Sequence, residues 1–516
     1  MLNWRVRYSR ILERTPELAD PQRSVLEVGC GPGGIARYLQ RPVVGLERDF
    51  CQPDTPWLDL RQGSILTLPF ADRSFDLVLC VDVLEHLAAE DRPQALRELL
   101  RVTRSRAWIA CPVAEWAEEA ERELEQWYTA LQLPVPEWLE EHRARGLPSL
   151  VSLLQEFLAL GVSPGVEVNE SMLQHLAGVV LDEVAPFSRR YLTALLEKSA
   201  ADPPFHGSDR DCPYSLLFEV VPSADPDAVG PALAPGGMAT RTHTTSLFRS
   251  SLHSDSRSHN RPPSPVPVRI HCVSHQGMPR FGSDILTPFL VGAAADALPA
   301  DTSVLSDREA PLRLNNSRWS ELSAVFDVWQ RGPRSAFVGF CHYRRFFDLQ
   351  PQAALGLDER RLAAAELGPE PQRLLAPPPA EWLGANRLVV KRPVVQRRSN
   401  AALYGEYHIF QDLLLLHMAV EAIAPALTPY FLEMMGSNRL YNCNLFLCSW
   451  ERFEQLCSLW FPILQALEQQ IPSREARVPY QVRDLSFLSE RLFSAWVLMQ
   501  QAEGVELIEP PILRLV

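Results

Sequence analysis

Several features that would narrow the function quickly are missing from this chain. Its 10 cysteines form no CxxC pair and, with the histidines, no run at the spacing of a zinc site. No apolar run approaches the length that spans a bilayer, and the N-terminal stretch MLNWRVRYSRILERTPEL lacks the apolar core of a signal peptide. We therefore expect reduced, buried cysteines and a cytoplasmic location, with peripheral association at a membrane left open.

The chain also lacks an excess of basic side chains. Its formal net charge is -13, whereas nucleic-acid binding proteins draw their affinity from lysine and arginine on phosphate. A general nucleic-acid binder is therefore excluded, although a local basic pocket is not. The apolar content of 46% and the charged content of 22% are ordinary for a globular protein, and 516 residues predict two or three domains.

Proline is abundant, at 44 residues, and much of it falls in one stretch after Pro222. That stretch, SADPDAVGPALAPGGMATRTHTTSLFRSSLHSDSRSHNRPPSPVP, has almost no hydrophobic periodicity. It offers too little apolar surface to offset the entropy lost on ordering, so we expect a disordered linker over 223–265. The linker predicts two domains, 1–222 and 266–516.

The most informative stretch of the first domain is SVLEVGCGPGG, Ser24 to Gly34. Its apolar residues predict a strand, its glycines a tight turn, and the following IARYLQ a helix. Such a turn lets the backbone approach a ligand closely. The next predicted strand ends in Glu47, where an acid suits the two hydroxyls of a ribose. Glu27 stands just before the turn, where it disfavours a diphosphate and favours a cationic amino-acid group.

Two further motifs, LPFADRSFDLV and VLEHL, predict a strand entry and a strand that runs into a helix. With the glycine turn and Glu47, they resemble the class I S-adenosylmethionine-dependent methyltransferases over about residues 20–115. The resemblance implies a Rossmann-like α/β sheet and S-adenosylmethionine as cofactor. It assigns cofactor binding to Glu27, Gly29, Gly31, Gly33, Glu47, Ser64, Ile65, Cys80 and Asp82.

Within that set, the resemblance gives each residue a part of the cofactor. It places Glu27 and the glycines at the methionine end, Glu47 on the ribose, Ile65 beside the adenine, and residues 80–83 over the sulfonium. Ser64 departs from the family, because many members carry an aspartate there to bond the adenine amino group.

Methyl transfer needs an aligned nucleophile and a group that takes its proton. His86 is the candidate base; packing of its helix is the alternative, and Glu85 is equally ambiguous. The charged stretch that follows brings His142 and Arg143, which either face an acceptor or lie on a solvated amphipathic helix. Residues 213–222, PYSLLFEVVP, predict the last strand of the domain.

In the second domain, VRIHCVSH predicts an opening strand, and the apolar run from Ile285 to Ala297 predicts a helix. Another helix is expected where Leu322, Val325 and Trp329 recur at helical spacing. It leads into FVGFCHYRRFFDL, which begins as a buried strand and then carries several polar side chains.

Those polar side chains alternate along the predicted strand, so His342 and Arg344 are expected on one face and Tyr343 and Arg345 on the other. The two arginines should therefore have different partners. We expect one to face a diphosphate, which the arginine fork fits, and the other to pair with an internal acid.

The stretches CHYRRFF, LYGEYHIFQDL, YNCNLFL, WFPILQALE and SERL resemble a bacterial family of unknown function found among capsular and exopolysaccharide biosynthesis proteins. Membership over nearly all of 266–500 implies an α/β domain of the nucleotide-sugar glycosyltransferase (GT-A-like) type, with a nucleotide sugar as donor. It implies Glu490 and His342 as catalytic residues, and Arg344, Arg345, Tyr343, Asn442 and Asn444 as substrate-binding residues.

The internal acid that pairs with an arginine is expected to be Glu490 or Glu321; a buried ion network without catalysis is the alternative. No Asp-x-Asp motif stands at the strand end. No metal ligand is therefore assigned, and a need for a divalent metal stays open.

Together these interpretations predict a bifunctional enzyme of surface-polysaccharide biosynthesis. One domain would methylate a glycan or sugar acceptor, and the other would transfer a sugar from a nucleotide donor. Two alternatives stay open: a methyltransferase whose second domain only binds glycan, and a methyltransferase of a small molecule such as a quinone.

Overall fold

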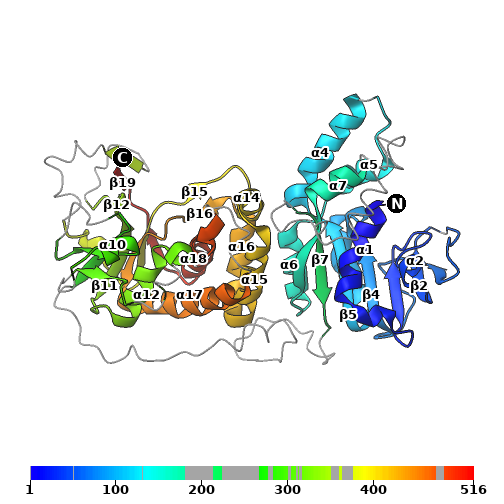
Figure 1. Ribbon diagram of the computed structural model, residues 1–516, viewed down its shortest axis with the longest axis horizontal. Coiled ribbons are helices and arrows are strands. Elements are labelled where there is room, and N and C mark those ends of the chain that lie inside the picture. The colour runs from blue at the N-terminus through cyan, green and yellow to red at the C-terminus, as the bar shows by residue number, and fades with distance from the viewer. Residues whose placement is uncertain are drawn as a thin grey trace. The chain divides into compact units, whose positions relative to one another are not determined.

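A computed structural model describes residues 2–49, 51–130, 132–179, 213–222, 267–276, 283–299, 304–309, 312, 316–349, 359–362, 376–471 and 481–515. The chain forms two compact units, Met1–Leu247 with Ala401–Leu414 and Phe248–Asn400 with Leu415–Val516 (Figure 1). The linker expected over 223–265 lies outside the described residues, so the domain boundaries 1–222 and 266–516 stay a prediction.

The first unit is built on a seven-stranded sheet in the order β3-β2-β1-β4-β5-β7-β6. Its strands are β1 (Val25–Val28), β2 (Val43–Glu47), β3 (Leu58–Gln62), β4 (Phe75–Val81), β5 (Thr103–Pro112), β6 (Gly165–Ser171) and β7 (Pro213–Val220). Strands β1 to β5 are parallel, and β7 and β6 continue the sheet as antiparallel strands beyond β5. The order 3-2-1-4-5 is that of doubly wound folds, which confirms the expected Rossmann-like sheet.

Local sequence explains these elements well. Every residue of β1 and β4 is buried, as is typical of parallel strands covered on both faces. The helices are α1 (Leu2–Arg14), α2 (Ala36–Leu39), α3 (Arg92–Val102), α4 (Ala114–Ala130), α5 (Glu137–Arg145), α6 (Leu150–Ala159) and α7 (Met172–Val179), with short 3-10 turns η1 (Pro16–Ala19), η2 (Leu84–His86) and η3 (Ala89–Asp91). Pro93 stands in the first turn of α3, and the Ser149 hydroxyl caps α6 by accepting from the Ser152 N–H.

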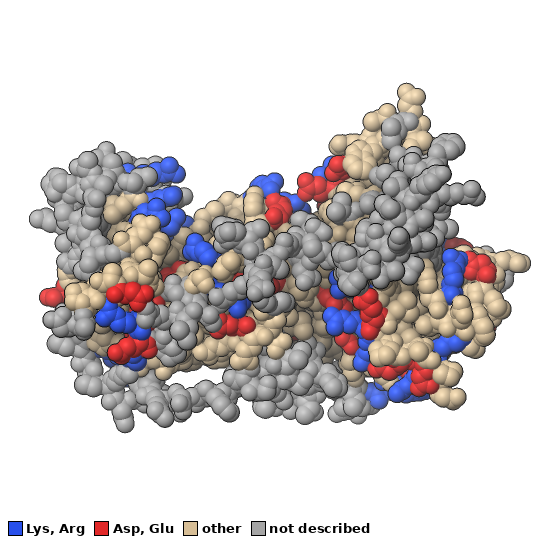
Figure 2. Space-filling model, in the orientation of Figure 1, with Lys and Arg blue, Asp and Glu red and all other residues tan. Residues whose placement is uncertain are grey.

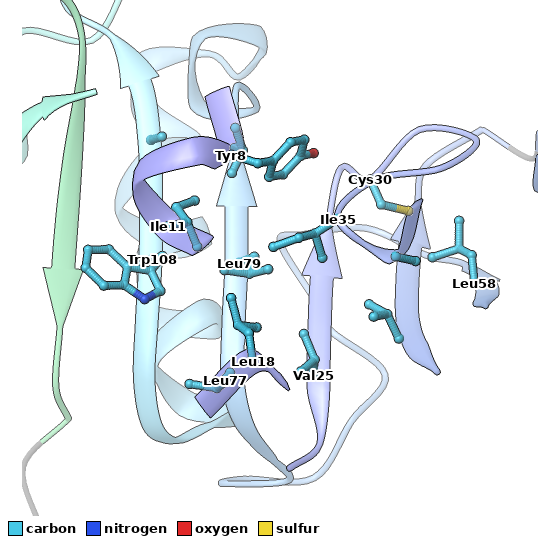
Figure 3. Close-up of a cluster of buried hydrophobic side chains, with 14 of the residues drawn as sticks. Tyr8, Ile11, Leu18, Val25, Cys30, Ile35, Leu58, Leu77, Leu79 and Trp108 are labelled. Carbon is cyan, nitrogen blue, oxygen red and sulfur yellow. The ribbon is translucent and has the colours of Figure 1, made fainter. Parts of the chain in front are cut away.

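Helix α1 packs its apolar side against the sheet. Tyr8 and Ile11 belong to one buried cluster with Val25 of β1, Leu79 of β4 and Trp108 of β5 (Figure 3). This cluster fixes the N-terminal helix over the sheet.

The second unit has a ten-stranded mixed sheet with a branch. Its main path is β10-β9-β8-β11-β12-β19-β13, and β17 leaves β11 to pair with β14, which pairs with β18. The strands are β8 (Val268–Ser274), β9 (Leu286–Leu290), β10 (Leu305–Ser306), β11 (Phe337–His342), β12 (Arg345–Phe347), β13 (Glu359–Leu362), β14 (Arg387–Val390), β17 (Phe446–Ser449), β18 (Glu506–Ile508) and β19 (Ile512–Leu515), with β15 (Val394–Val395) and β16 (Arg439–Leu440) as a separate pair. This α/β architecture confirms the expected class.

The helices with residues in the second unit are α10 (Ala293–Asp296), α11 (Asn316–Trp319), α12 (Leu322–Arg331), α14 (Asn400–Tyr407), α15 (Phe410–Ile423), α16 (Thr428–Gly436), α17 (Trp450–Gln470) and α18 (Asp484–Ala502), with 3-10 turns η9 (Ala380–Trp382), η10 (Pro425–Leu427) and η12 (Gln481–Arg483). The helix expected from Ile285 to Ala297 forms only at its end, as α10. The first part of the apolar run forms strand β9, parallel to β8, because a strand buried in a parallel sheet is as continuously apolar as a buried helix.

The polar motif of the second unit is a hairpin, not a regular strand. β11 ends at His342, the chain turns through Tyr343 and Arg344, and β12 begins at Arg345, which pairs with His342. The predicted separation of the arginines by strand alternation is therefore wrong. Instead, His342 and Arg345 share a face as a cross-strand pair.

Two general expectations can be compared with the described residues. Cys80, Cys111, Cys272 and Cys341 are buried free thiols, as predicted. Among the helices that the structure describes, none combines the length and the apolar character needed to cross a bilayer. On the face shown in Figure 2, basic and acidic side chains lie beside one another at several places, in keeping with a chain without a basic excess.

Candidate functional site

A cavity of about 510 Å³ opens at the carboxyl ends of the parallel strands of the first unit. The segments that follow β1, β2, β3 and β4 line it, with Gly29, Glu47, Ser64 and Asp82 among the residues of the wall. Strand β1 has β2 on one side and β4 on the other, so the cavity lies at the switch point where doubly wound sheets bind ligands. Its volume is that of a small-molecule site.

The turn after β1 requires glycine. Gly29 and Gly34 have φ values of 74° and 49°, in the left-handed region that glycine adopts without steric cost. A Cβ on Gly29 would lie 2.2 Å from Cγ2 of Val83, and one on Gly34 would lie 2.2 Å from Oε2 of Glu27. The turn is therefore built so that backbone alone forms this part of the cavity wall.

Glu27 braces this turn from behind. Its side chain is fully buried, Oε1 accepts from the Tyr8 hydroxyl at 2.6 Å, and Oε2 accepts from the Ile35 N–H at 2.7 Å. Burial raises the pKa of Glu27 to about 7, although the two hydrogen bonds oppose the shift. The structure thus places Glu27 behind the turn and not on the cavity wall that the resemblance implied.

Two more residues of the predicted cofactor set also lie off the wall. Cys80 is fully buried inside β4, and Gly33 stands in the turn beside Asp54 and Arg37. The predicted residues that do line the cavity are Gly29, Gly31, Glu47, Ser64, Ile65 and Asp82.

Glu47 lies on the cavity wall, where the sequence predicted a carboxylate for the ribose of the cofactor. It ends β2, and one of its carboxylate oxygens accepts from the Gly31 N–H. Partial burial raises the pKa of Glu47. Beyond it, Ser64 and Ile65 follow β3, and the Ser64 hydroxyl accepts from the Leu66 N–H at 3.2 Å.

Asp82 and Arg7 form an ion pair at the opposite wall. Arg7 Nε lies 2.8 Å from Oδ2 of Asp82, and both residues line the cavity. Asp82 has a φ of 53°, a strained conformation for a non-glycine residue and one that is common at functional sites. Sequence reasoning missed Arg7 and Tyr8. The only signal for them was the amphipathic pattern of the N-terminal helix.

His86 lines the same cavity. Its Nδ1 lies 2.9 Å from Oε2 of Glu141, which also belongs to the wall. Burial and the neighbouring His142 lower the pKa of His86, so the ring is neutral near pH 7. A neutral ring held by a carboxylate is suited to accept a proton or to bind a ligand.

His142 lies close behind, with its ring centre 4.8 Å from that of His86. It is buried, and its Nδ1 lies 2.8 Å from Oε1 of Glu121, which also accepts from the Tyr214 hydroxyl at 2.8 Å. Arg143, next to it in sequence, is exposed and pairs with an acid of α4. The structure therefore brings His142 to the site and leaves Arg143 outside it.

The wall fits S-adenosylmethionine by its chemistry. The glycine turn lets the backbone approach an amino-acid end, Glu47 can accept from ribose hydroxyls, and Ile65 offers an apolar surface to a base. Although Arg7 pairs with Asp82, five acidic residues line the cavity against three arginines, and this excess suits a ligand that carries a sulfonium.

Two protein families match separate parts of this chain. Residues 26–111 match the family described as methyltransferase domain, and residues 269–501 match the family described as domain of unknown function (DUF4422). The chain therefore carries a methyltransferase domain followed by a DUF4422 domain.

Two curated relatives of this chain are methyltransferases. A probable S-adenosylmethionine-dependent methyltransferase of Mycolicibacterium smegmatis is 37% identical over 16% of this chain and 34% of its own length. A probable phthiotriol/phenolphthiotriol dimycocerosates methyltransferase of Mycobacterium ulcerans is 36% identical over 20% of this chain and 48% of its own length. The chain thus spans between about a third and a half of the length of these relatives.

Among solved structures, the apo form of the bifunctional glycosyltransferase WbbM is similar at 20% identity, with a TM-score of 0.41. The likeness covers 48% of this chain and 45% of WbbM, and it is too low to bear on function.

In the second unit, several predicted residues gather where β11 ends. His342 and Arg345 share a face, and Glu321 and Arg483 lie within electrostatic reach of the His342 ring. Burial lowers the pKa of His342, and its Nε2 is buried without a hydrogen-bond partner among the residues that the structure describes. An unpaired buried ring nitrogen next to an arginine marks this cluster as a candidate site.

The arginines are not paired as predicted. Within the part of the chain that the structure describes, neither Arg344 nor Arg345 forms an ion pair, so the expected pairing of one of them with Glu490 or Glu321 is not formed. Arg344 is exposed, and its guanidinium carbon lies 4.9 Å from the centre of the Tyr343 ring.

The acids bond instead to the segment before β17. Asn444 Nδ2 donates to Oε1 of Glu321 at 3.0 Å and to the Ser489 hydroxyl at 2.9 Å, and the Cys443 N–H donates to Oε1 of Glu490 at 2.7 Å. Burial raises the pKa of Glu490. Cys443 and Asn444 both have positive φ, so these bonds hold a strained backbone in place.

Asn442 and Asn444 lie in the segment between β16 and β17. Asn442 Oδ1 accepts from Nζ of Lys391 at 2.7 Å. Asn444 is buried, so it positions neighbouring groups, whereas Asn442 is partly exposed.

Proposed function

We propose that the first domain transfers the methyl group of S-adenosylmethionine to an oxygen of a sugar or glycan. The observation that carries methyl transfer is the cavity at the sheet's switch point, where the glycine turn and Glu47 occupy the walls that the cofactor needs. When bound, S-adenosylmethionine supplies an electrophilic methyl group on a sulfonium.

The residues of this chain then have distinct tasks. Gly29 and Gly31 admit the amino-acid end, and Glu47 orients the ribose. Asp82, held by Arg7, places negative charge on the wall. His86 is the nearest group for the acceptor, and Glu141 orients its ring.

Calorimetric titration of the full chain with S-adenosylmethionine tests this proposal. Glu47→Ala removes acceptors for two hydroxyls, so we expect about a 10- to 100-fold weaker affinity, as for loss of hydrogen bonds to a charged group. Glu90→Ala removes an exposed carboxylate outside the cavity and should bind like the wild type. Absence of binding to the wild type, or equal binding by Glu47→Ala, would contradict the proposal.

We further propose that the second domain binds a nucleotide sugar and transfers its sugar, in a pathway of surface-polysaccharide biosynthesis. Support comes from the cluster around His342 and Arg345, where, among the residues that the structure describes, the ring nitrogen Nε2 of His342 has no hydrogen-bond partner and Arg345 forms no ion pair. Glu490 and the exposed Arg344 complete the set of groups that such a donor would meet. Its acceptor would be a glycan or sugar, with no role for nucleic acid.

A panel of nucleotide sugars, screened on the full chain by thermal shift and by donor hydrolysis, tests this second activity. We expect one donor to raise the melting temperature and to be hydrolysed, with Mn²⁺ and without it as separate arms. If no donor binds in either arm, the second domain is a glycan-binding module and the methyltransferase stands alone.

A small-molecule acceptor for the methyl group is the other candidate, because curated relatives include a demethylmenaquinone methyltransferase of Lactiplantibacillus plantarum. Methylation assays with a sugar, a glycan and a quinol in parallel distinguish the two.

A further inference from the structure

Three side chains beside the methyl-donor cavity lie close enough to bind one ion. A carboxylate oxygen of Glu85 and one ring nitrogen each of His86 and His142 lie within 4.8 Å of one another. Ligand distances of about 2.1 Å place two ligands of one ion roughly 3–4 Å apart, so small side-chain rotations bring all three into range. The sequence assigned no metal here, because 55 residues separate His142 from its partners.

Two of the three side chains are buried with an unused ligand atom. Glu85 is 1% exposed and His142 is 5% exposed. Within the described part of the chain, Oε2 of Glu85 and Nε2 of His142 have no hydrogen-bond partner. A buried unpaired polar atom is costly and needs an explanation, and an ion between them supplies one for both.

Both histidines are also held as metal ligands usually are. Nδ1 of His86 lies 2.9 Å from Glu141 and Nδ1 of His142 lies 2.8 Å from Glu121. A carboxylate on one ring nitrogen fixes the tautomer and directs the other nitrogen to the ion. The same arrangement in two adjacent histidines is an observation independent of their proximity.

Nearby charge favours a cation as well. Asp82 and Glu121 lie within electrostatic reach of the Glu85 carboxylate and disfavour its ionised form, whereas Arg7 favours it. A divalent ion would offset this concentration of buried carboxylates.

We propose that Glu85, His86 and His142 bind a divalent transition-metal ion that holds the methyl acceptor. Two imidazoles and one carboxylate suit ions such as Zn²⁺, Co²⁺ or Fe²⁺ and leave coordination positions open. Because His86 lines the cavity, a hydroxyl of the acceptor can reach one of these positions. An acceptor with two neighbouring hydroxyls, as in a sugar, could occupy two of them.

The chemistry of this arrangement rests on the methyl transfer proposed above. Coordination lowers the pKa of the acceptor hydroxyl, and its proton leaves to water at the cavity mouth. The oxygen lone pair forms the new bond to the methyl carbon while the carbon–sulfur bond breaks, and its electron pair stays on sulfur. His86 is then a ligand and not the base, which changes the part that the sequence gave it.

Metal titration of the full chain, stripped of ions with a chelator, tests the site directly. We expect one Co²⁺ per chain to bind with a visible absorption band of nitrogen–oxygen coordination, and Zn²⁺ to displace it. Glu121→Gln removes a partner that orients a ligand and should weaken metal binding by roughly 10- to 100-fold. Glu85→Gln and His142→Gln each remove a ligand and should weaken it by more than that. Glu140→Gln, on the same helix as His142 but exposed, should bind like the wild type.

His86→Gln tests a ligand whose replacement should not disturb folding, because the His86 side chain is about a third exposed, unlike the buried Glu85 and His142. If His86→Gln, Glu85→Gln and wild type bind Co²⁺ equally, or if the wild type itself does not bind it, the site is refuted. A parallel titration with S-adenosylmethionine separates the two proposals. Cofactor binding without metal binding overturns only the metal site. Metal binding without cofactor binding overturns methyl transfer and with it the ion's role in holding the acceptor, but it leaves the metal site itself in place.

Discussion

The two candidate sites use left-handed backbone in different ways. In the first, Gly29 and Gly31 take positive φ, together with the non-glycine residue Asp82, whereas in the second the residues with positive φ are Ser320, Cys443 and Asn444. Glycine adopts this conformation freely, but other residues lose about 1–2 kcal/mol by it. The first site is therefore built mainly on a glycine turn shaped for a ligand, with strain at Asp82, and the second is a strained segment that surrounding polar groups must hold.

The largest effect should come from adding a methyl group to the glycine turn. In Gly29→Ala, the new Cβ meets Val83 at 2.2 Å in a backbone with a φ of 74°. We expect S-adenosylmethionine affinity to fall by at least about 100-fold, because the turn must move out of the position that the cofactor needs. Calorimetric titration measures the loss.

Gly504→Ala is the matched control for this prediction. Gly504 has a φ of 84°, but a Cβ there meets nothing within 4 Å, and the residue lies in the second unit. Gly504→Ala therefore has the cost of a positive φ without a steric clash, and it should leave cofactor binding unchanged. Equal cofactor affinity in Gly29→Ala and wild type would show that the turn does not form the binding wall.

The free energy of unfolding should depend on pH through Glu27, which braces the glycine turn of the first site. Glu27 has its pKa raised to about 7 in the folded protein, whereas the unfolded chain loses this proton near its ordinary value of 4.5. Between these values the folded state binds the extra proton, so stability is greatest below 4.5 and falls as pH rises toward 7. The loss amounts to about 3 kcal/mol, at 1.36 kcal/mol for each pH unit.

Glu27→Gln checks this, because glutamine resembles the protonated acid and can donate to the Tyr8 oxygen while accepting from the Ile35 N–H. Urea unfolding at pH 5 and pH 8 should show the variant gaining on the wild type by about 2–3 kcal/mol at the higher pH. A gap between the two proteins that is the same at both pH values would mean that Glu27 keeps an ordinary pKa.

At Asn444 of the second site, a glycine variant should be more stable than an alanine variant, the reverse of the usual order, because the backbone there is strained. Asn444→Ala and Asn444→Gly both lose the bonds to Glu321 and Ser489, but only alanine strains a φ of 48°. We expect the glycine variant to be more stable by about 1 kcal/mol in urea unfolding. At Asn442, which has no positive φ, alanine should be the more stable of the two, and the same order at both positions would contradict the strain.

The contrast between the sites also explains how much could be predicted. The glycine turn was predicted because a run of glycines between two strands indicates an unusual backbone and a ligand. Glu47 was predicted because it ends the second strand, and Asp82 was predicted from the resemblance to methyltransferases. Tyr8 and Arg7 were not, because a helical pattern shows an apolar face but not the strands on which it lies.

The second unit was harder for physical reasons that particular residues show. The turn at Tyr343 and Arg344 contains no glycine, asparagine or proline, and neither residue has a positive φ, so the sequence carried no turn signal. Cys443 likewise has a left-handed conformation that its residue type does not predict. Long-range hydrogen bonds, such as that from the Cys443 N–H to Glu490, decide these positions, and they leave no local pattern.

The smallest effect should come from the exposed arginine of the hairpin. Arg344→Ala removes a side chain that lies over the Tyr343 ring and forms no ion pair among the described residues, so the free energy of unfolding should change by less than about 0.5 kcal/mol. Affinity for the nucleotide sugar found in the donor panel should nevertheless fall by about 10-fold, as for one charge-assisted hydrogen bond at an exposed site.

Arg344→Lys should give an intermediate donor affinity, because lysine keeps the charge and loses the fork that grips a diphosphate. Unchanged donor affinity in Arg344→Ala would remove the hairpin arginine from the donor site. If Arg345→Ala then also bound the donor like the wild type, the polar cluster at His342 would be structural. The positive φ of Cys443 and Asn444 would in that case maintain the fold, and only the glycine turn would serve a ligand.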